Sequence, residues 1–152
     1  MDILTNSAAQ TKKIGQALGH FLRSGDVVAL EGPLGVGKTT LVKGIAKGLG
    51  FAKERSVASP TFVLMHEYQG RESVHHLDWY RLVRVAGVDA EMAEECFTSG
   101  VTLIEWPERG KTLLPPGAWR VTIEHRGPSS RRLSILFPSE PDPVLIKALK
   151  AR

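Results

Sequence analysis

In some segments of this chain the apolar residues recur at helical spacing, and in others they form short runs typical of strands. This pattern predicts a succession of helices and strands. Apolar residues three and four apart predict a helix over Ser7–Leu22 and a second helix that ends at Gly50. Short apolar runs rich in β-formers predict buried strands at Asp26–Leu30 and at Val101–Trp106, the latter stopped by Pro107. The chain is therefore expected to fold as an α/β protein.

Two pairs of strand candidates lie too close together in sequence to be joined by crossover helices. Phe62–Tyr68 and Ser73–Asp78 form the first pair, and Trp119–His125 and Arg132–Phe137 form the second. Each pair is separated by a short glycine-containing connection, which is typical of an antiparallel hairpin. A sheet built only from βαβ units would not contain such pairs, so we expect a mixed, partly antiparallel central sheet.

The remaining segments complete one compact unit. Trp79–Phe97 is expected to be mainly helical, Phe51–Ala58 irregular, and Val144–Arg152 a short terminal helix. At 152 residues, without internal repeats or a linker, the chain is expected to form a single domain over residues 1–152.

Composition limits the class of protein and the compartment that we expect. The residues are 42% hydrophobic and 24% charged, as in ordinary globular proteins, and the net charge of +4 permits contact with RNA or an acidic partner. Cys96 is the only cysteine, which excludes a disulfide framework and a cysteine metal cluster. Neither a signal pattern nor an apolar run of membrane-spanning length is visible, so we expect a cytoplasmic protein with no membrane contact.

The most informative stretch is Gly32–Thr40, which reads G-x-x-x-x-G-K-T-T between a predicted strand and a predicted helix. This is the P-loop pattern in its proper context: the backbone amides and the helix N-terminus face a phosphate chain. Lys38 would reach the β- and γ-phosphates, and the Thr39 hydroxyl would bind magnesium. The predicted phosphate-binding residues are Gly35, Val36, Gly37, Lys38, Thr39 and Thr40.

Two acidic residues are candidates to complete a phosphoryl-transfer site. Asp78 and Glu105 each end an apolar strand, and strand carboxyl ends face the ligand crevice of an open α/β sheet. Either could bind magnesium directly or through water, and the pattern leaves this choice open. Thr61 lies where other P-loop proteins carry a mobile segment that senses the γ-phosphate.

Three other residue types carry weaker signals. His75 and His76 are neighbours on a strand, so their side chains point to opposite faces, and we expect packed or surface positions for both. Trp106 is expected in the core or at a cavity rim. Cys96 lacks the basic or helix-terminal surroundings of a reactive thiol.

These segments together resemble the bacterial TsaE (YjeE) family of small ATPases in tRNA threonylcarbamoyladenosine biosynthesis. The resemblance runs in order over nearly the whole chain, through the P-loop, S-P-T-F at Ser59–Phe62, H-x-D-x-Y-R at His76–Arg81 and E-W-P at Glu105–Pro107. It implies a P-loop NTPase-like three-layer sandwich that binds ATP with magnesium and hydrolyses it, slowly when alone.

The resemblance also implies partners and further site residues. The partners would be a TsaD-type transferase and its paralogue TsaB, with tRNA contacted either directly or only through them. Thr11 would lie near the nucleotide, Glu108 and Arg131 near the rim of the site, and Asp78 and Glu105 would serve the metal and the attacking water. In the family the ATPase drives or resets the cycle and does not itself transfer the carbamoyl group.

Two other functions use the same phosphate cradle. A P-loop kinase for small molecules would need an arginine-bearing lid and an acceptor site, for which 152 residues leave little room. A nucleotide-gated interaction module would bind ATP without hydrolysing it, and replacing Glu105 with Gln would then cost no activity.

Overall fold

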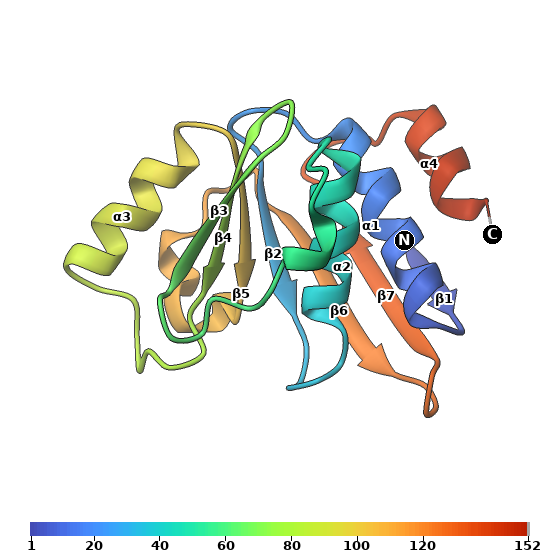
Figure 1. Cartoon of the computed structure of the whole chain (residues 1–152), viewed down its shortest axis with the longest axis horizontal. Coiled ribbons are helices and arrows are strands. Elements are labelled where there is room, and N and C mark those ends of the chain that lie inside the picture. Colours follow the sequence, from blue (N-terminus) through green and yellow to red (C-terminus); the bar gives the residue numbers. More distant parts are fainter. Residues whose placement is uncertain (152) are drawn as a thin grey trace.

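A seven-stranded mixed sheet runs through the centre of the computed structural model, which describes residues 1–151 (Figure 1). The strand order is β1-β7-β6-β2-β5-β4-β3. Strands β6, β2, β5 and β4 are parallel, whereas β1, β7 and β3 are antiparallel to their neighbours. The strands are β1 (Asp2–Thr5), β2 (Val27–Glu31), β3 (Met65–Gln69), β4 (Ser73–Asp78), β5 (Val101–Glu105), β6 (Trp119–His125) and β7 (Arg131–Leu136).

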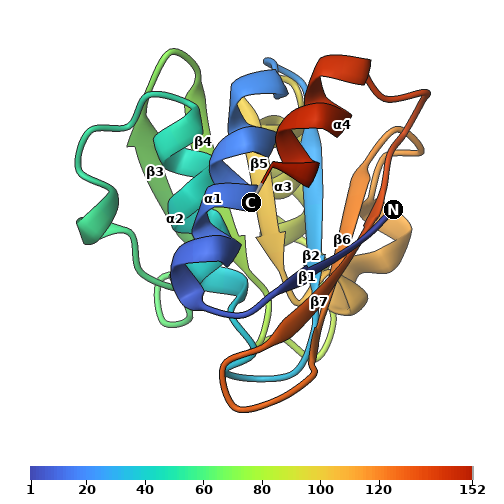
Figure 2. The same cartoon turned by 90° about the vertical axis from the view of Figure 1, so that its right-hand side faces the viewer.

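Helices cover both faces of the sheet, so the expected three layers are present. In Figures 1 and 2, α1, α2 and α4 lie on one face, while α3 lies on the other. Each face has its own buried apolar cluster, the larger one beneath α1, α2 and α4. The helices are α1 (Ala8–Phe21), α2 (Lys38–Gly48), α3 (Val88–Phe97) and α4 (Pro143–Lys150), with 3-10 turns η1 (Glu54–Ser56) and η2 (Pro107–Leu113).

Side chains form hydrogen bonds with the backbone at both ends of helix α1. The Ser7 hydroxyl accepts a hydrogen bond from the Gln10 amide at 3.2 Å, which caps the first turn. At the other end, the Arg71 guanidinium donates to the carbonyls of Gly19, His20 and Leu22, which have no partner within the helix. The predicted first helix is thereby confirmed to within one residue at each end.

Helices α1 and α2 approach each other more closely than side chains normally permit. Gly15 and Gly19 on α1 face Gly44 and Gly48 on α2, and a Cβ atom at any of the four would lie within 3.0 Å of a backbone carbonyl oxygen of the other helix. The absence of side chains therefore sets this spacing. It fixes α1 against the helix that follows the P-loop.

Both predicted hairpins are confirmed, in β3–β4 and β6–β7, but the predicted start of β3 and the predicted end of β5 are wrong. The strand expected from Phe62 begins at Met65, because the amides of Val63 and Leu64 bond to the Pro60 carbonyl in a turn and Leu64 has a φ of 67°. The strand expected to reach Trp106 ends at Glu105, because Trp106 adopts a φ of 60°.

The segment Trp79–Phe97, expected to be mainly helical, is helical only from Val88. The Trp79 amide bonds to the Glu105 carbonyl and the Val85 amide to the Arg109 carbonyl, so tertiary contacts use donors that a helix would need. Gly87, with a φ of 57°, then precedes the first helical turn.

The two ends of the chain form a strand and a helix. Strand β1 was not predicted, and it forms only by pairing with β7 at the far end of the sequence. The terminal helix runs over Pro143–Lys150, and Arg152 lies outside the described residues. Within residues 1–151, no helix combines the length and apolar character needed to cross a bilayer.

Candidate functional site

The P-loop joins β2 to α2 as an open loop with exposed backbone. Gly35 and Gly37 have φ values of 74° and 119°, conformations that residues with side chains rarely adopt. A Cβ atom at either glycine would meet nothing within 4 Å, so both face open space. Helix α2 begins at Lys38, directly after the loop, so that its first unpaired amides point toward this space. The loop therefore provides a cradle that an anion could fill.

Lys38 is folded back onto its own loop and only 4% exposed. Its Nζ donates to the carbonyls of Gly32 and Pro33, and lies 4.1 Å from the centre of the Trp106 ring. Burial lowers the pKa of the Lys38 ammonium, and the carboxylates of Glu105, Glu108 and Asp78 act in the opposite direction. Trp106, expected in the core or at a rim, thus lies at the cavity rim and contacts the lysine.

Asp78 and Glu105 lie directly opposite each other on neighbouring parallel strands. Residues on one strand alternate between faces, so Asp78 and His76 face α2, as do Glu105 and Leu103 on β5. Both carboxylates are nearly fully buried, with exposures of 2% and 3%. The two acids that the sequence indicates are therefore brought together at the carboxyl ends of the parallel strands, beside the P-loop.

Hydroxyl groups from two segments already contact these carboxylates. Thr39 Oγ1 donates to Glu105 Oε1 at 3.0 Å, which links the start of α2 to β5. Thr61 Oγ1 donates to Asp78 Oδ2 at 2.9 Å, and the Ser59 hydroxyl donates to the same oxygen. Thr39, Asp78 and Glu105 thus converge, and the segment at Thr61 closes over one of the acids.

The sequence reasoning missed the role of the residues behind Glu105. His76 is completely buried, and its Nε2 lies 2.8 Å from Glu105 Oε1. Its Nδ1 lies 3.0 Å from the hydroxyl of Tyr68 on β3. His75, next in sequence, faces the other side of the sheet, as expected, and neither of its ring nitrogens has a hydrogen-bond partner within the described part of the chain. The H-x-D spacing was the available signal, since it places His76 and Asp78 on one face.

A cavity lies on each side of the P-loop, and Gly35, Gly37 and Thr40 line both. We call the first, of about 280 Å³, the acid-side cavity. Its lining comprises Leu34, Gly35, Gly37, Lys38, Thr39, Thr40, Ser59, Thr61, Asp78, Tyr80, Glu105 and Trp106. The predicted phosphate, metal and catalytic residues are therefore gathered mainly around one space.

The second cavity, of about 270 Å³, we call the α1-side cavity. Its lining comprises Ala8, Thr11, Gly35, Val36, Gly37, Thr40, Pro128, Ser129 and Arg131. Arg131 Nε donates to the Val36 carbonyl at 2.7 Å, and the Thr11 hydroxyl lies 2.8 Å from that of Thr5. Thr11 and Arg131, far apart in the sequence, thus meet beside the P-loop.

Glu108 lines neither of these cavities. It lies in η2 and borders a separate hollow with Glu31, Lys111 and Arg120. Its negative charge nevertheless acts on Lys38, because it opposes the lowering of the Lys38 pKa that burial causes. The structure therefore places Glu108 close to the P-loop lysine electrostatically but outside the lining of the two cavities.

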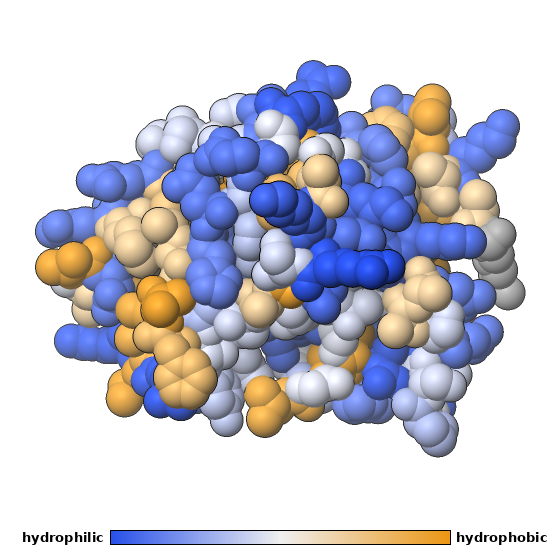
Figure 3. All heavy atoms as spheres, in the orientation of Figure 1, coloured by the Kyte–Doolittle hydropathy of each residue, from blue (hydrophilic) through white to orange (hydrophobic). Residues whose placement is uncertain are grey.

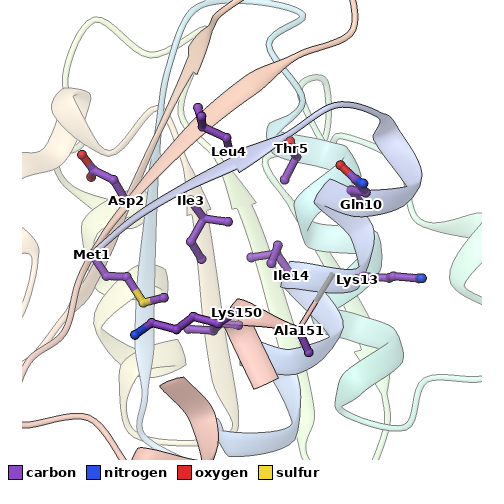
Figure 4. A pocket seen from close by; sticks show the side chains of 11 residues that line it. Met1, Asp2, Ile3, Leu4, Thr5, Gln10, Lys13, Ile14, Lys150 and Ala151 are labelled. Carbon is purple, nitrogen blue, oxygen red and sulfur yellow. The ribbon is translucent and has the colours of Figure 1, made fainter. Parts of the chain in front are cut away.

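A larger cavity, of about 420 Å³, lies elsewhere, between β1, α1 and the end of α4 (Figure 4). Apolar side chains such as Ile3 and Ile14 point into it, and Lys13 and Lys150 stand at its edges. It holds neither an acid pair nor a glycine-rich loop, so it offers no phosphoryl chemistry. Size alone does not identify the candidate site.

The donor set at the acid-side cavity fits magnesium held partly by phosphate. Within residues 1–151, no group of three or more His, Cys, Asp and Glu side chains is placed to hold a metal. Magnesium bound to nucleotides commonly takes only one or two protein ligands and draws the others from water and phosphate oxygens. Thr39, Asp78 and Glu105 supply oxygen atoms of that kind next to the open cradle at Gly35 and Gly37.

Comparison with known proteins agrees with the order of the motifs. Residues 5–133 match the family model described as threonylcarbamoyl adenosine biosynthesis protein TsaE. The tRNA threonylcarbamoyladenosine biosynthesis protein TsaE of Treponema pallidum is 37% identical over 136 residues, covering 89% of this chain and 99% of that protein. The Bacillus subtilis protein of the same name is 37% identical over 131 residues, covering 86% of this chain and 81% of that protein.

A solved structure extends the similarity to three dimensions. The crystal structure of Bacillus subtilis YdiB superposes with a TM-score of 0.76 at 30% sequence identity, covering 98% of this chain and 93% of the other. A likeness of this extent covers the sheet, its flanking helices and the P-loop together.

Proposed function

The chain belongs to the TsaE family of threonylcarbamoyl adenosine biosynthesis proteins, and from this premise we propose that it is an ATPase in the modification of tRNA to threonylcarbamoyladenosine. One observation carries the proposal. Asp78 and Glu105 end adjacent strands and line one cavity of about 280 Å³ together with Lys38 and Thr39. Acids, lysine and hydroxyl are the groups that phosphoryl transfer to water requires.

We assign the γ-phosphate and magnesium to the acid-side cavity. Lys38 would leave the carbonyls of Gly32 and Pro33 to meet the β- and γ-phosphates, since a triphosphate offers its ammonium more negative charge than a carbonyl does. Magnesium, when bound, would neutralise charge on the phosphate oxygens. Thr39, Asp78 and Glu105 would hold it directly or through water, and a carboxylate not used in this way would orient the attacking water.

We assign the nucleoside to the α1-side cavity. The phosphate cradle opens into both cavities, so a nucleotide whose γ-phosphate and magnesium fill the acid-side cavity would extend its sugar and base into the other. Thr11 offers a hydroxyl on this side, and Arg131 holds the P-loop carbonyl of Val36. Glu108 is assigned an electrostatic effect on Lys38 in place of a direct contact with the nucleotide.

The kinase alternative finds less support. A kinase that phosphorylates a small molecule needs cationic groups to screen the transferred phosphoryl group and a place for the acceptor. No arginine of the described residues lines the acid-side cavity, and the exposed side chains in its lining are those of Leu34 and Tyr80. Water is therefore the proposed acceptor.

We further propose that the protein acts in the cytoplasm with a TsaD-type transferase and TsaB. Apolar side chains are exposed beside the acid-side cavity, and Figure 3 shows apolar surface gathered at the lower left, where the loops before β3 and after β4 lie in Figure 1. We call these residues the apolar rim: Leu34, Phe62, Val63, Tyr80 and Val83. Phe62 is 82% and Val83 91% exposed, and exposure of this kind favours a protein partner.

The P-loop lysine provides the test of nucleotide binding. Lys38→Ala should weaken ATP binding by about 100-fold, because charge-assisted hydrogen bonds to two phosphates contribute about 3 kcal/mol together. Lys43→Ala is the matched control, since Lys43 lies on the same helix but lines neither cavity. Calorimetric titration with ATP and magnesium measures both affinities. Equal affinities for the two variants would contradict the assignment.

The pathway and the partner surface are tested by reconstitution. tRNA modification should require this chain together with both partners, and the rate of ATP hydrolysis should fall toward that of the isolated chain when either partner is left out. Phe62→Ser should reduce stimulation by the partners about 10-fold, because an exposed aromatic residue at an interface commonly contributes more than 1 kcal/mol. Hydrolysis by the isolated chain should not change. Undiminished stimulation would exclude the apolar rim as the partner surface.

A further inference from the structure

A chain of hydrogen bonds, two of them buried and the last partly buried, connects Glu105 to the backbone that precedes Thr61. Glu105 Oε1 lies 2.8 Å from His76 Nε2, and His76 Nδ1 lies 3.0 Å from the Tyr68 hydroxyl. That hydroxyl is in turn 3.3 Å from the Ala58 carbonyl. The next residues along the chain are Ser59 and Pro60, so these contacts reach the segment whose hydroxyls bind Asp78.

The chemistry of each group fixes the direction of these bonds. A carboxylate only accepts, so His76 donates from Nε2 to Glu105, and the Nδ1 of a neutral imidazole accepts the Tyr68 proton. Burial raises the pKa of Tyr68 to about 12, so its hydroxyl keeps its proton and remains a donor. Phe51 packs on the Tyr68 ring at 5.1 Å between ring centres and holds it in place.

The Tyr68 hydroxyl has one proton and three partners within reach: His76 Nδ1 at 3.0 Å, the Ala58 carbonyl at 3.3 Å and His66 Nδ1 at 3.4 Å. His66 Nδ1 also lies 3.1 Å from the Ala58 carbonyl, so a hydrogen bond between these two leaves His76 and Ala58 as the acceptors for Tyr68. A shift of the Ala58 carbonyl toward Tyr68 would draw that proton away from the imidazole and loosen the orientation of His76. The position of this backbone therefore affects how firmly the Glu105 carboxylate is held toward Thr39.

We propose that Tyr68 and His76 are positioning residues that orient the Glu105 carboxylate and make this orientation depend on the Ala58–Thr61 segment. The inference rests on the proposed hydrolysis of ATP. Both acids would then respond to the same segment: Asp78 through the hydroxyls of Ser59 and Thr61, and Glu105 through the buried pair. Neither positioning residue lines the acid-side cavity.

Two adjacent histidines provide a matched kinetic comparison. His76→Gln should lower kcat about 10-fold, as is typical when the residue behind a functional carboxylate is replaced, and should leave the KM for ATP within about twofold. His75→Gln is the control, because it makes the same change one residue away on the opposite face. Equal kcat values for His76→Gln and His75→Gln would overturn the proposal.

A double-mutant cycle separates positioning from general loss of structure. If His76 acts through Glu105, then His76→Gln should have no further effect on kcat once Glu105→Gln is present. A tenfold loss that persists in the Glu105→Gln background would contradict the proposal. Tyr68→Phe removes only the hydroxyl group. Like His76→Gln, it should lower kcat, and the denaturant midpoint of unfolding should change only slightly.

A measurement that needs no turnover completes the test. In the ¹⁵N-histidine-labelled full chain, the ring resonances of His76 should report a donor at Nε2 and an acceptor at Nδ1, and they should shift in both Tyr68→Phe and Glu105→Gln. Unchanged His76 resonances in those variants would overturn the positioning pair. If the unaltered chain hydrolysed no ATP even with its partners, the proposed function would fail, whereas these resonances would still decide whether the pair exists.

Discussion

The two cavities beside the P-loop have nearly equal volumes, about 280 and 270 Å³, but differ in what bounds them. The α1-side cavity is bounded by a helix that packs on α2 through bare backbone and by the β6–β7 hairpin. The acid-side cavity is bounded by two strand ends and by a non-helical, non-strand segment around Thr61.

This difference teaches which side can change shape. Glycine contacts between α1 and α2 leave no side chain that could adjust, so Thr11 is fixed relative to the P-loop. On the other side, hydroxyls of Ser59 and Thr61 hold Asp78, and these hydrogen bonds can be exchanged for water or metal at small cost. We therefore expect the α1-side residues to affect affinity but not turnover, and the two acids to determine turnover, with Lys38 serving nucleotide binding from the acid side.

The largest effect is expected on the acid side. Asp78→Ala should reduce magnesium-dependent kcat by about 100-fold, because one group that stabilises developing charge typically contributes that much. ATP affinity should change by less than about threefold, since Lys38 and the P-loop amides remain. Steady-state hydrolysis and nucleotide titration measure the two quantities. Wild-type turnover in this variant would exclude Asp78 from the site and remove the contrast between the sides.

A second prediction concerns the rigidity of the α1 side. Gly44→Ala should lower the free energy of unfolding by about 2 kcal/mol, because overpacking against the Lys12 carbonyl costs about 3 kcal/mol while alanine adds about 1 kcal/mol of helix propensity. Gly117→Ala is the control, since a Cβ there would meet nothing within 4 Å. Denaturant unfolding followed by circular dichroism gives both values, and equal stabilities would mean that the helices separate freely.

The sequence predicts the α1 side of the P-loop better than the acid side. The P-loop, α1, α2 and the two hairpins carry local patterns, and the structure contains all of them. Strand β1 could not be predicted, because its four residues, of which Asp2 and Leu4 are exposed, form a strand only next to β7, whose sequence lies almost the full length of the chain away.

The incorrect and missed predictions lie mostly on the acid side. Trp79–Gly87 has helical spacing, but its amides bond to the carbonyls of Glu105 and Arg109, which no local pattern reveals. In sequence, only the H-x-D spacing to Asp78 distinguishes His76 from His75. The contacts of His76 arise because three neighbouring strands bring Tyr68, His76 and Glu105 together. Motif spacing identified the two acids, whereas the groups that orient them depend on tertiary structure.

The smallest of these effects is expected for Arg131, on the α1 side of the P-loop. Arg131 donates to the Val36 carbonyl at 2.7 Å and to three carbonyls of its own hairpin, so it ties the P-loop to the β6–β7 turn. Arg131→Ala should weaken ATP binding by about 10-fold, since one hydrogen bond from a charged group contributes about 1.5 kcal/mol. Under saturating ATP, kcat should stay within about twofold, because Asp78 and Glu105 lie across the P-loop from this residue. Arg126→Ala, an exposed change in the same hairpin, is the matched control. A fall in kcat at unchanged affinity would show that the α1 side also takes part in turnover.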